Sequence, residues 1–221
     1  VHSMKDMPST PAKGLVFTKV WKREDPRDVL ILRTAKHLSE LREDAVIATG
    51  SKRRAFQLLK LRPDLQIINI RGNVDTRLRK MEEQQLDGIV LAAAGLKRLG
   101  MEDVITQYLA PEDMISAPAQ GALALEVRED QKELQKMLDV FCDEETMNEV
   151  CAERNFLEQM GGSCHTPAGA RCQKTDQGYE LYAMFGNEDG SKQAYTKVYG
   201  TCPEILAQTA VKNIKKQLAG I

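Results

Sequence analysis

The sequence lacks the features that mark several classes of protein. Its 221 residues carry a formal net charge of −1, whereas a nucleic-acid-binding protein is normally clearly basic. No apolar run approaches the roughly 20 residues that span a bilayer, and there is no signal-peptide pattern. We therefore expect a cytoplasmic protein with neither a nucleic-acid nor a membrane partner.

Cysteine and histidine are few and scattered. The five cysteines form no CxxC pair, and together with the three histidines they give no template for a metal site. An odd number of cysteines at irregular spacing is typical of a reducing cytosol. The remaining composition, 42% hydrophobic and 29% charged, is ordinary, and the length suffices for one large domain or two small ones.

The chain also lacks an initiating methionine. It begins with Val1 and enters the polar motif His2-Ser3-Met4-Lys5-Asp6-Met7-Pro8 with no strand or helix before it. We interpret the chain as a fragment without its natural N-terminus. Lys5 and Asp6 are adjacent, so on an extended segment they would point to opposite faces and contact different neighbours. An exposed charged loop is the alternative interpretation.

A cysteine lies in a tightly constrained loop, Gly161-Gly162-Ser163-Cys164-His165-Thr166-Pro167. A helix is expected over 143–160, and the glycines end it because glycine adopts the left-handed C-terminal conformation at no steric cost. The proline fixes the exit from the loop. Cysteine is a strong nucleophile, so Cys164 can carry a covalent adduct; the alternative is a small buried residue in a tight turn.

Strands and helices alternate after a charged stretch at 22–28, which we predict to be a linker. Strands are expected at 29–32, 45–49, 65–70 and 88–93. Helices are expected at 34–42, 50–61 and 71–84, with a further helical turn from 94. This alternation predicts βα units and a mostly parallel sheet.

Cations follow three of the expected strands, at Ser51-Lys52-Arg53-Arg54, at Arg71 and Arg77, and at Lys97-Arg98. A cation in the first turn of a helix opposes the macrodipole, at about 0.3–1 kcal/mol each, unless an anion is near. Parallel sheets bind ligands outside the carboxyl ends of their strands, and arginine pairs with carboxylates or phosphates. The repetition favours an anionic ligand. The alternative is solvated arginines paired with Asp75 or Glu82.

A Pro/Gly break at 114–121 precedes an expected strand at 122–127 and helix at 131–141. A chain that leaves one sheet at the linker and returns here predicts two α/β lobes joined by a double crossover, as in periplasmic binding proteins, with a ligand cleft. Strands at 168–173, 179–185 and 193–199, a hairpin turn at 187–190 and a helix from 203 predict a small α+β domain. The expected domains are 1–21 with 122–140, then 22–121, then 141–221.

Five motifs share one property, which is that they occur in a fixed order along nearly the whole chain. They are the motif at 2–8, Ser51-Lys52-Arg53-Arg54, Arg71-Gly72-Asn73-Val74-Asp75-Thr76-Arg77-Leu78, Ala92-Ala93-Ala94-Gly95-Leu96-Lys97-Arg98-Leu99-Gly100 and Pro118-Ala119-Gln120-Gly121. In this order they resemble the porphobilinogen deaminase (hydroxymethylbilane synthase) family. The loop Gly161-Gly162-Ser163-Cys164 resembles the family's cofactor-attachment loop.

The resemblance implies a transferase of tetrapyrrole (haem) biosynthesis. It would link four porphobilinogen units head to tail into hydroxymethylbilane, with release of ammonia, on a covalent dipyrromethane primer, one per chain. Cys164 matches the cysteine whose thioether holds this cofactor, and Asp6 matches the catalytic aspartate. The positions that match those holding the acetate and propionate groups of cofactor and substrate are Lys5, Ser51, Arg53, Arg54, Arg71, Arg77 and Arg98, the last on the substrate.

The residues suit that chemistry. Each pyrrole carries two carboxylates, so a growing oligomer needs cationic partners such as arginine. Loss of ammonia leaves a cationic azafulvene, which a carboxylate such as Asp6 stabilises while it accepts hydrogen bonds from pyrrole N–H groups. The same carboxylate can move protons to the leaving amine and from the pyrrole carbon.

The chain departs from the family in lacking the stretch that precedes the first motif and completes the first lobe. We therefore expect an incomplete domain 1, and an inactive fragment of the enzyme is one alternative. A two-lobed anion-binding protein without chemistry is another, although it would need neither Asp6 nor Cys164. The resemblance further implies porphobilinogen as the small-molecule partner, no metal and a monomer.

Overall fold

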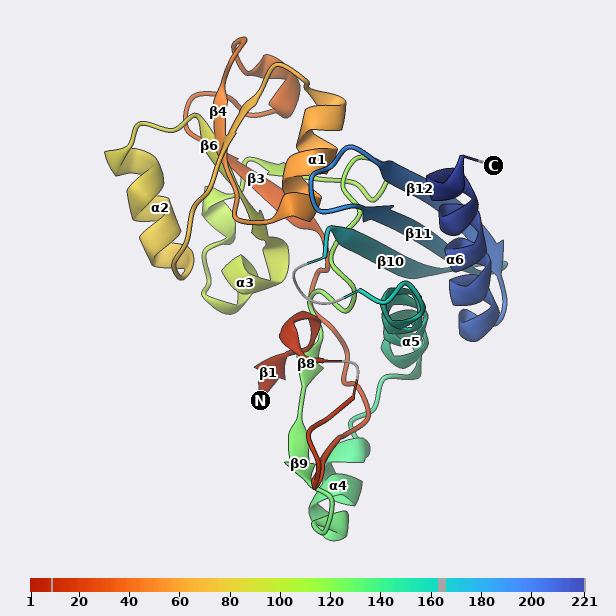
Figure 1. Cartoon of the computed structure of the whole chain (residues 1–221). Coiled ribbons are helices and arrows are strands. Elements are labelled where there is room, and N and C mark those ends of the chain that lie inside the picture. Colours follow the sequence, from red (N-terminus) through yellow and green to blue (C-terminus); the bar gives the residue numbers. More distant parts are fainter. Residues whose placement is uncertain (9, 163–165, 221) are drawn as a thin grey trace. The chain divides into compact units, whose positions relative to one another are not determined.

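A computed structural model describes residues 1–8, 10–162 and 166–220 of the chain. These residues form two compact units, one made of Val1–Pro26 and Ile115–Ile221 and the other of Arg27–Met114. The chain therefore passes twice between the units, after residue 26 and after residue 114 (Figure 1). This confirms the predicted double crossover. The boundaries of the three expected domains stay a prediction.

The unit Arg27–Met114 is built on a five-stranded sheet with the order β5-β4-β6-β3-β7. Its strands are β3 (Asp28–Leu32), β4 (Val46–Ala48), β5 (Gln66–Ile68), β6 (Gly88–Ala92) and β7 (Gln107–Tyr108). Strand β4 runs parallel to β5 and β6, as predicted, but β3 runs antiparallel to both β6 and β7. The prediction of a mostly parallel sheet is therefore wrong for β3 alone, which enters from the other unit and has no helical crossover before it.

Three helices cover the two faces of this sheet: α1 (Lys52–Leu61), α2 (Val74–Glu83) and α3 (Ala93–Arg98). Alternate residues of β3 and β6 point to opposite faces. Leu30 and Val90 pack with Leu58 of α1 on one face. The neighbouring residues of these two strands point to the opposite face, where they pack with Met81 of α2 and Leu96 of α3. The result is an α/β unit whose sheet is buried on both sides.

The helix expected at 34–42 does not form. The segment holds only the 3₁₀-helix η2 (Leu38–Glu40), and Glu40 accepts hydrogen bonds from the backbone N–H groups of Lys36 and His37 at 2.9 and 3.2 Å. Leu38 and Leu41 are nevertheless buried. Their spacing of three therefore comes from a loop that inserts two side chains into the core, and not from helical periodicity.

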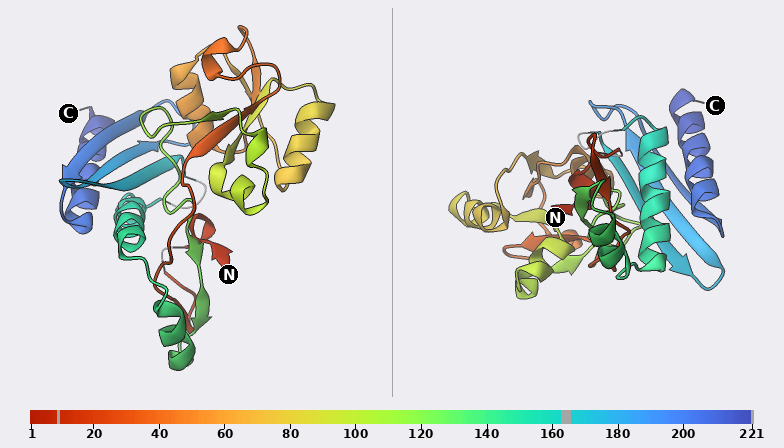
Figure 2. Two further views of the ribbon diagram at one scale, coloured as in Figure 1. Left: turned by 180° about the vertical axis from the view of Figure 1, so that it is seen from behind. Right: turned by 90° about the horizontal axis from the view of Figure 1, so that it is seen from below.

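The C-terminal part of the first unit is a three-stranded antiparallel sheet, β10 (Ala168–Thr175), β11 (Gly178–Gly186) and β12 (Gln193–Gly200). Helices α5 (Glu144–Gln159) and α6 (Pro203–Ala219) lie side by side on one face of it (Figure 2). Their core includes the fully buried Phe156, Leu181 and Ile214. The predicted α+β domain is confirmed, with two helices rather than one on the sheet.

The ends of α5 form where the sequence places them. Asp143 caps the first turn by accepting a hydrogen bond from the N–H of Thr146 at 2.8 Å. Gly161 follows the helix with a φ of +67°, in the left-handed region that favours glycine. Residues 163–165, and with them Cys164, lie outside the described residues.

The remainder of this unit consists of two short antiparallel ladders. Strand β1 (His2–Ser3) pairs with β8 (Leu123–Ala124), and β2 (Leu15–Phe17) pairs with β9 (Glu126–Arg128). The strand expected at 122–127 is thus two strands. Before them, Gly121 has a φ of +89°, and a Cβ there would lie 2.2 Å from the carbonyl oxygen of Glu24, so only glycine fits.

A short helix, α4 (Lys132–Asp139), follows β9 and is tied to the segment before the first crossover. The indole Nε1–H of Trp21 donates to the carbonyl of Leu138 at 2.9 Å. The Trp21 ring lies 5.0 Å from the ring of Phe141 in a tilted arrangement, which is a favourable geometry for an aromatic pair.

Candidate functional site

Lys5 and Asp6 lie in a single turn of 3₁₀-helix, η1 (Met4–Asp6), and the expectation of an extended segment is wrong. The turn follows β1, and the N–H of Met4 donates to the carbonyl of Ala122 at 3.0 Å. Lys5 Nζ donates to Gln120 Oε1 at 3.3 Å, whereas Asp6 is exposed. The two charged residues do contact different surroundings, and the Asp6 carboxylate faces solvent.

The arginine candidates lie in the other unit, which is built on the five-stranded sheet. Strands β4, β5 and β6 are parallel, so their carboxyl ends share an edge (Figure 1). Ser51 and Arg71 follow the ends of β4 and β5, and α3 begins directly after β6. Asp28 starts the antiparallel strand β3 opposite Ala92, which places its carboxylate at the same edge.

Arg53 and Arg54 are buried there, at 4% and 6% exposure, against the fully buried Asp28. Arg53 Nη1 lies 2.7 Å from Asp28 Oδ2, and Arg54 Nη2 and Nε lie 2.6 and 3.0 Å from Oδ1. Arg54 Nη1 also donates to the carbonyl of Val90 at 3.1 Å. Burial lowers the pKa of Arg53, as does the neighbouring Arg54, while Asp28 opposes this shift.

Asp28 therefore supplies an anion for the first-turn cations of α1. The argument from the macrodipole assigned that anion to a ligand, and neither Asp75 nor Glu82 pairs with Arg53 or Arg54 in the contacts described above. Ser51 caps α1 by accepting from the N–H of Arg54 at 3.4 Å. These three candidates thus have clear structural roles in starting α1 and fixing it to the sheet.

Arg71 and Arg77 are placed differently. Arg71 is exposed, and its carbonyl accepts from Lys80 Nζ at 3.0 Å. Arg77 Nε donates to the carbonyl of Gly72 at 2.7 Å, and its pKa is lowered by burial and by the nearby Arg54. The guanidinium groups of Arg77 and Arg54 therefore repel each other at this sheet edge, and the binding of a carboxylate ligand there stays a prediction.

Arg98 does not support the macrodipole argument. It lies in the last turn of α3 together with Lys97, where a cation is favourable without any ligand. Lys97 Nζ also lies 3.7 Å from Glu102. Arg98 is exposed and so accessible to a ligand, but its position in the helix is no evidence for an anionic ligand.

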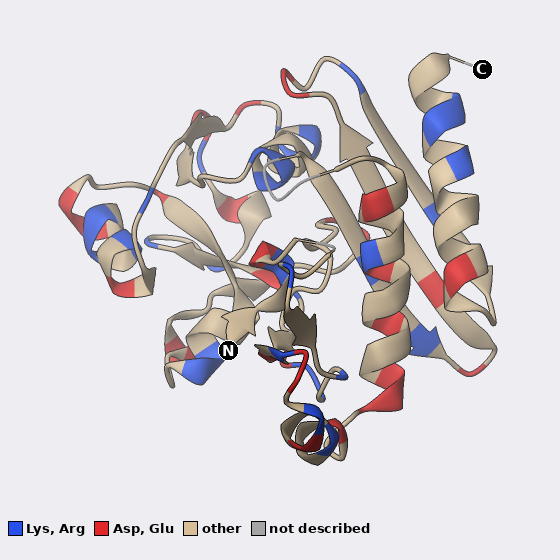
Figure 3. Ribbon diagram, turned by 60° about the horizontal axis from the view of Figure 1, so that its bottom comes forward, with Lys and Arg blue, Asp and Glu red and all other residues tan. Residues whose placement is uncertain are grey.

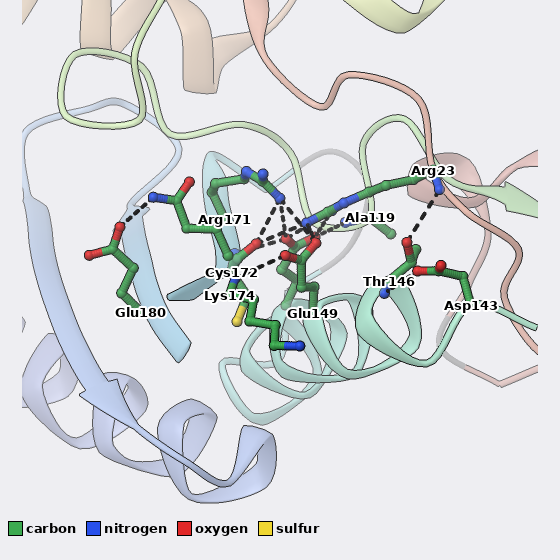
Figure 4. Close-up of polar contacts among 11 residues, drawn as sticks. Arg23, Ala119, Asp143, Thr146, Glu149, Arg171, Cys172, Lys174 and Glu180 are labelled. Atoms are coloured by element: carbon green, nitrogen blue, oxygen red, sulfur yellow. Dashed lines mark hydrogen bonds and ion pairs between the residues drawn. The ribbon is translucent and has the colours of Figure 1, made fainter. Parts of the chain in front are cut away.

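Arg23, in the predicted linker, belongs to a buried cluster of charged side chains that the sequence analysis did not predict (Figure 4). Arg23 Nη1 donates to both carboxylate oxygens of Glu153, at 3.0 and 3.1 Å, and Nη2 donates to Glu149 at 2.5 Å and to the carbonyl of Cys172 at 2.9 Å. Arg171 lies 3.5 Å from Glu149 and 3.8 Å from Glu153. Glu153 also accepts from the backbone N–H groups of Ala119 and Cys172. One signal was available, because Glu149 and Glu153 are four residues apart and so share a helix face.

Burial dominates the electrostatics of this cluster. It raises the pKa of Glu149 to about 7, against the effect of Arg23, and it raises the pKa of the fully buried Glu153. Burial alone would lower the pKa of Arg23, but the two carboxylates raise it. Acidic residues predominate along α5 (Figure 3), and the cluster joins this helix to β10 and to the segment before the crossover.

An α/β unit with arginines along one sheet edge has the features of an anion-binding α/β protein. Comparison with known proteins narrows this class. Residues 1–136 match the family described as "Porphobilinogen deaminase, dipyromethane cofactor binding domain", and residues 147–219 match "Porphobilinogen deaminase, C-terminal domain". The chain belongs to the porphobilinogen deaminase family, which confirms the resemblance.

Similar proteins in bacteria carry the same description. The porphobilinogen deaminase of Lachnospira eligens is 53% identical over 215 residues, which cover 96% of this chain and 73% of that protein. That of Clostridioides difficile is 46% identical over 220 residues, covering 98% of this chain and 73% of the relative. Among solved structures, the periplasmic VFT2 domain of Bordetella pertussis BvgS is similar at 17% identity and a TM-score of 0.36, over 57% of this chain and 53% of that one.

Proposed function

We propose that the chain is a transferase that joins four porphobilinogen units head to tail, with release of ammonia, to give hydroxymethylbilane for tetrapyrrole biosynthesis. The observation that carries the proposal is the family match, which extends over residues 1–136 and 147–219. An anion-binding protein without chemistry is not favoured, because that family is an enzyme family.

The cofactor is a covalent dipyrromethane, and it supplies the primer from which the pyrrole chain grows. The described residues fit a group that carries several carboxylates. Arg71 is exposed at the carboxyl edge of the sheet, and Arg77 lies beside Arg54 with a lowered pKa. The thioether attachment at Cys164 rests on the resemblance of the loop, since that residue is outside the described part of the chain.

The chain's own residues divide the remaining work in this proposal. The carboxylates of cofactor and substrate bind to Arg71, Arg77 and Arg98, with Lys5, Ser51, Arg53 and Arg54 completing the set. The exposed carboxylate of Asp6 accepts hydrogen bonds from pyrrole N–H groups and stabilises positive charge that develops as ammonia leaves. It also takes up the proton that the ring carbon releases.

The burial of Arg53 and Arg54 refines this division. Both hydrogen-bond to Asp28, so a large part of their hydrogen-bonding capacity is used internally. They act on the ligand chiefly as a fixed positive potential at the start of α1, whereas Arg71 and Arg77 make the more adaptable contacts. The burial of Arg53 and Arg54 and the exposure of Arg71 support this assignment.

The protein works as a monomer in the cytoplasm in this proposal. Within the part of the chain that the structure describes, no helix has the length and apolar character needed to cross a membrane. The net charge of −1 and the interspersed surface charges favour a small-molecule partner over a nucleic acid.

The test is the intact mass of the chain purified from cells that make haem, combined with an aldehyde colour test for pyrroles. We expect a mass increase equal to one dipyrromethane per chain and a positive colour, both lost in Cys164→Ser. The control is Cys151→Ser, on α5, which keeps both signals. An unmodified wild-type mass without colour would contradict the proposal.

A further inference from the structure

The segment that carries Asp6 is held by a single arginine from helix α5. Arg154 Nη1 lies 3.1 Å from the carbonyl oxygen of Met4 and 3.4 Å from that of Met7. Arg154 Nη2 lies 2.5 Å from the carbonyl oxygen of Pro8. Three carbonyls from both sides of Asp6 thus converge on one guanidinium.

These contacts add to apolar packing, because the buried Met4 lies in a core cluster with Val150 of α5 and Met7 packs against that cluster. Before Asp6, the backbone is held by the two-residue β1–β8 ladder and by the bond from Met4 to Ala122. After Asp6, the N–H of Met7 bonds back to Met4 at 3.1 Å, closing the turn on itself. Arg154 therefore fixes the C-terminal side of the turn to the rest of the unit.

The geometry requires a guanidinium rather than any cation. The planar guanidinium presents five N–H donors in a fixed fork, whereas a lysine is a point charge on a flexible stem. The side chain is half-buried and its group also lies 6.0 Å from the ring centroid of Phe17. Burial lowers the pKa of Arg154, but an arginine remains charged in proteins.

We propose that Arg154 is a positioning residue for the Asp6 carboxylate, acting through the backbone of residues 4–8. The proposal rests on the proposed function for the role of Asp6, but the backbone contacts do not. Arg154 touches no reacting atom in this scheme. It holds the turn so that the carboxylate projects in one direction, and its loss lets the turn fray.

Helix α5, which carries Arg154, also leads toward the predicted cofactor loop. Helix α5 ends at Gln159, and the chain then enters the loop predicted to carry the cofactor cysteine. The same helix therefore anchors the aspartate segment and leads into the cofactor loop. A shift of α5 would move both, so the helix couples the placement of the acid–base group to the start of the loop.

The first test is amide hydrogen exchange of the full chain, in Arg154→Met, Arg154→Lys and the control Arg128→Met. Arg128 is an exposed arginine of β9 whose ion pair is with Asp130. We expect exchange at residues 4–7 to be at least about 10-fold faster in both Arg154 variants, and unchanged in the control. Unchanged exchange at 4–7, or an equal increase throughout the unit, would overturn the proposal.

The second test is turnover of porphobilinogen by the cofactor-loaded enzyme. We expect kcat to fall by about 100-fold in Arg154→Met with little change in KM and with cofactor content retained. Added guanidinium ion at low concentration should restore part of kcat in Arg154→Met and none in Asp6→Asn. A fall confined to KM, or the absence of rescue, would contradict the positioning role. Absence of turnover in the wild type would instead contradict the proposed function, and the exchange result would still decide the contact.

Discussion

Replacement of Arg23 by methionine is the sharpest test of the buried ion cluster. Methionine keeps much of the side-chain volume and removes the guanidinium that contacts Glu149, Glu153 and the carbonyl of Cys172. The two carboxyl groups then keep their bonds from backbone N–H groups, but the remaining cation, Arg171, lies farther away, at 3.5 and 3.8 Å. The side chains of Arg23, Glu149 and Glu153 are 5%, 9% and 0% exposed, so solvent cannot compensate.

The size of the effect follows from this burial. Removing one partner of a buried ion pair costs about 3–5 kcal/mol, against a total stability of about 5–15 kcal/mol for a typical domain. We therefore expect the free energy of unfolding to fall by about 3–5 kcal/mol at about pH 8, since each buried carboxyl group must then either stay charged without a close cation or hold a proton that the unfolded state has released.

The stability lost in Arg23→Met should depend on pH. In the wild type the pKa of Glu149 is raised from 4.5 to about 7, so the folded state holds a proton that the unfolded state releases between these values. Stability from this group is present at low pH and falls as pH rises through that window, by up to about 3 kcal/mol. Without Arg23 the pKa of both carboxyl groups rises further. The loss caused by Arg23→Met should therefore be smaller at about pH 5 than at about pH 8.

Urea unfolding at the two pH values measures this directly, with Arg128→Met as the control. The control removes an exposed ion pair and should change the free energy of unfolding by less than about 1 kcal/mol. A loss below about 1 kcal/mol for Arg23→Met, or a loss that does not vary with pH, would show that the cluster is better solvated than its burial indicates.

Two further predictions concern the arginine-bearing edge of the other unit. Asp28→Asn should lower the free energy of unfolding by about 3–5 kcal/mol, because Arg53 and Arg54 lose the carboxylate that they share. Urea unfolding followed by circular dichroism measures this change, and a fall of less than about 1 kcal/mol would count against the pairing. Arg71→Met should change stability by less than about 0.5 kcal/mol while weakening porphobilinogen binding in a direct titration. Arg79→Met, which removes the exposed pair with Glu83, is its control, and equal binding by both variants would remove Arg71 from the site.

The parts of the fold that local signals control were predictable. Asp143 and Gly161 delimit α5 through their own side chain and backbone preferences, and these preferences act within a few residues. Strands β10, β11 and β12 lie close to the segments 168–173, 179–185 and 193–199 expected from the sequence, and the hairpin turn at 187–190 lies between the last two. Each of these elements needs no knowledge of distant residues.

The errors have a common cause, which is that burial of a charge depends on a partner far away in the sequence. Arg23 finds Glu153 at a separation of 130 residues, and Arg54 finds Asp28 at 26. From composition alone, a stretch that is charged and free of apolar residues predicts an exposed linker. The direction of β3 was lost for a similar reason, since its neighbour β6 lies some 60 positions later in the chain, a separation that only tertiary pairing reveals.

The sequence predicted which residues belong to the candidate site better than it predicted what each of them does. The ordered motifs identified the family, and the family match confirms that identification. The individual roles of Asp6, Cys164 and the arginines stay predictions. The sequence alone does not distinguish the buried arginines from the exposed one. Arg53 and Arg54 are buried against Asp28, whereas Arg71 is exposed.

The contacts of Trp21 make it a built-in optical probe. It is the sole tryptophan of the chain, and its fluorescence depends on the indole hydrogen bond to Leu138 and on the nearby Phe141 ring. Its emission therefore reports on the unit that contains Arg23, Arg154 and Asp6, and the unit Arg27–Met114 is silent at tryptophan excitation. A midpoint seen by fluorescence that differs from the midpoint seen by circular dichroism would show that the two units unfold separately.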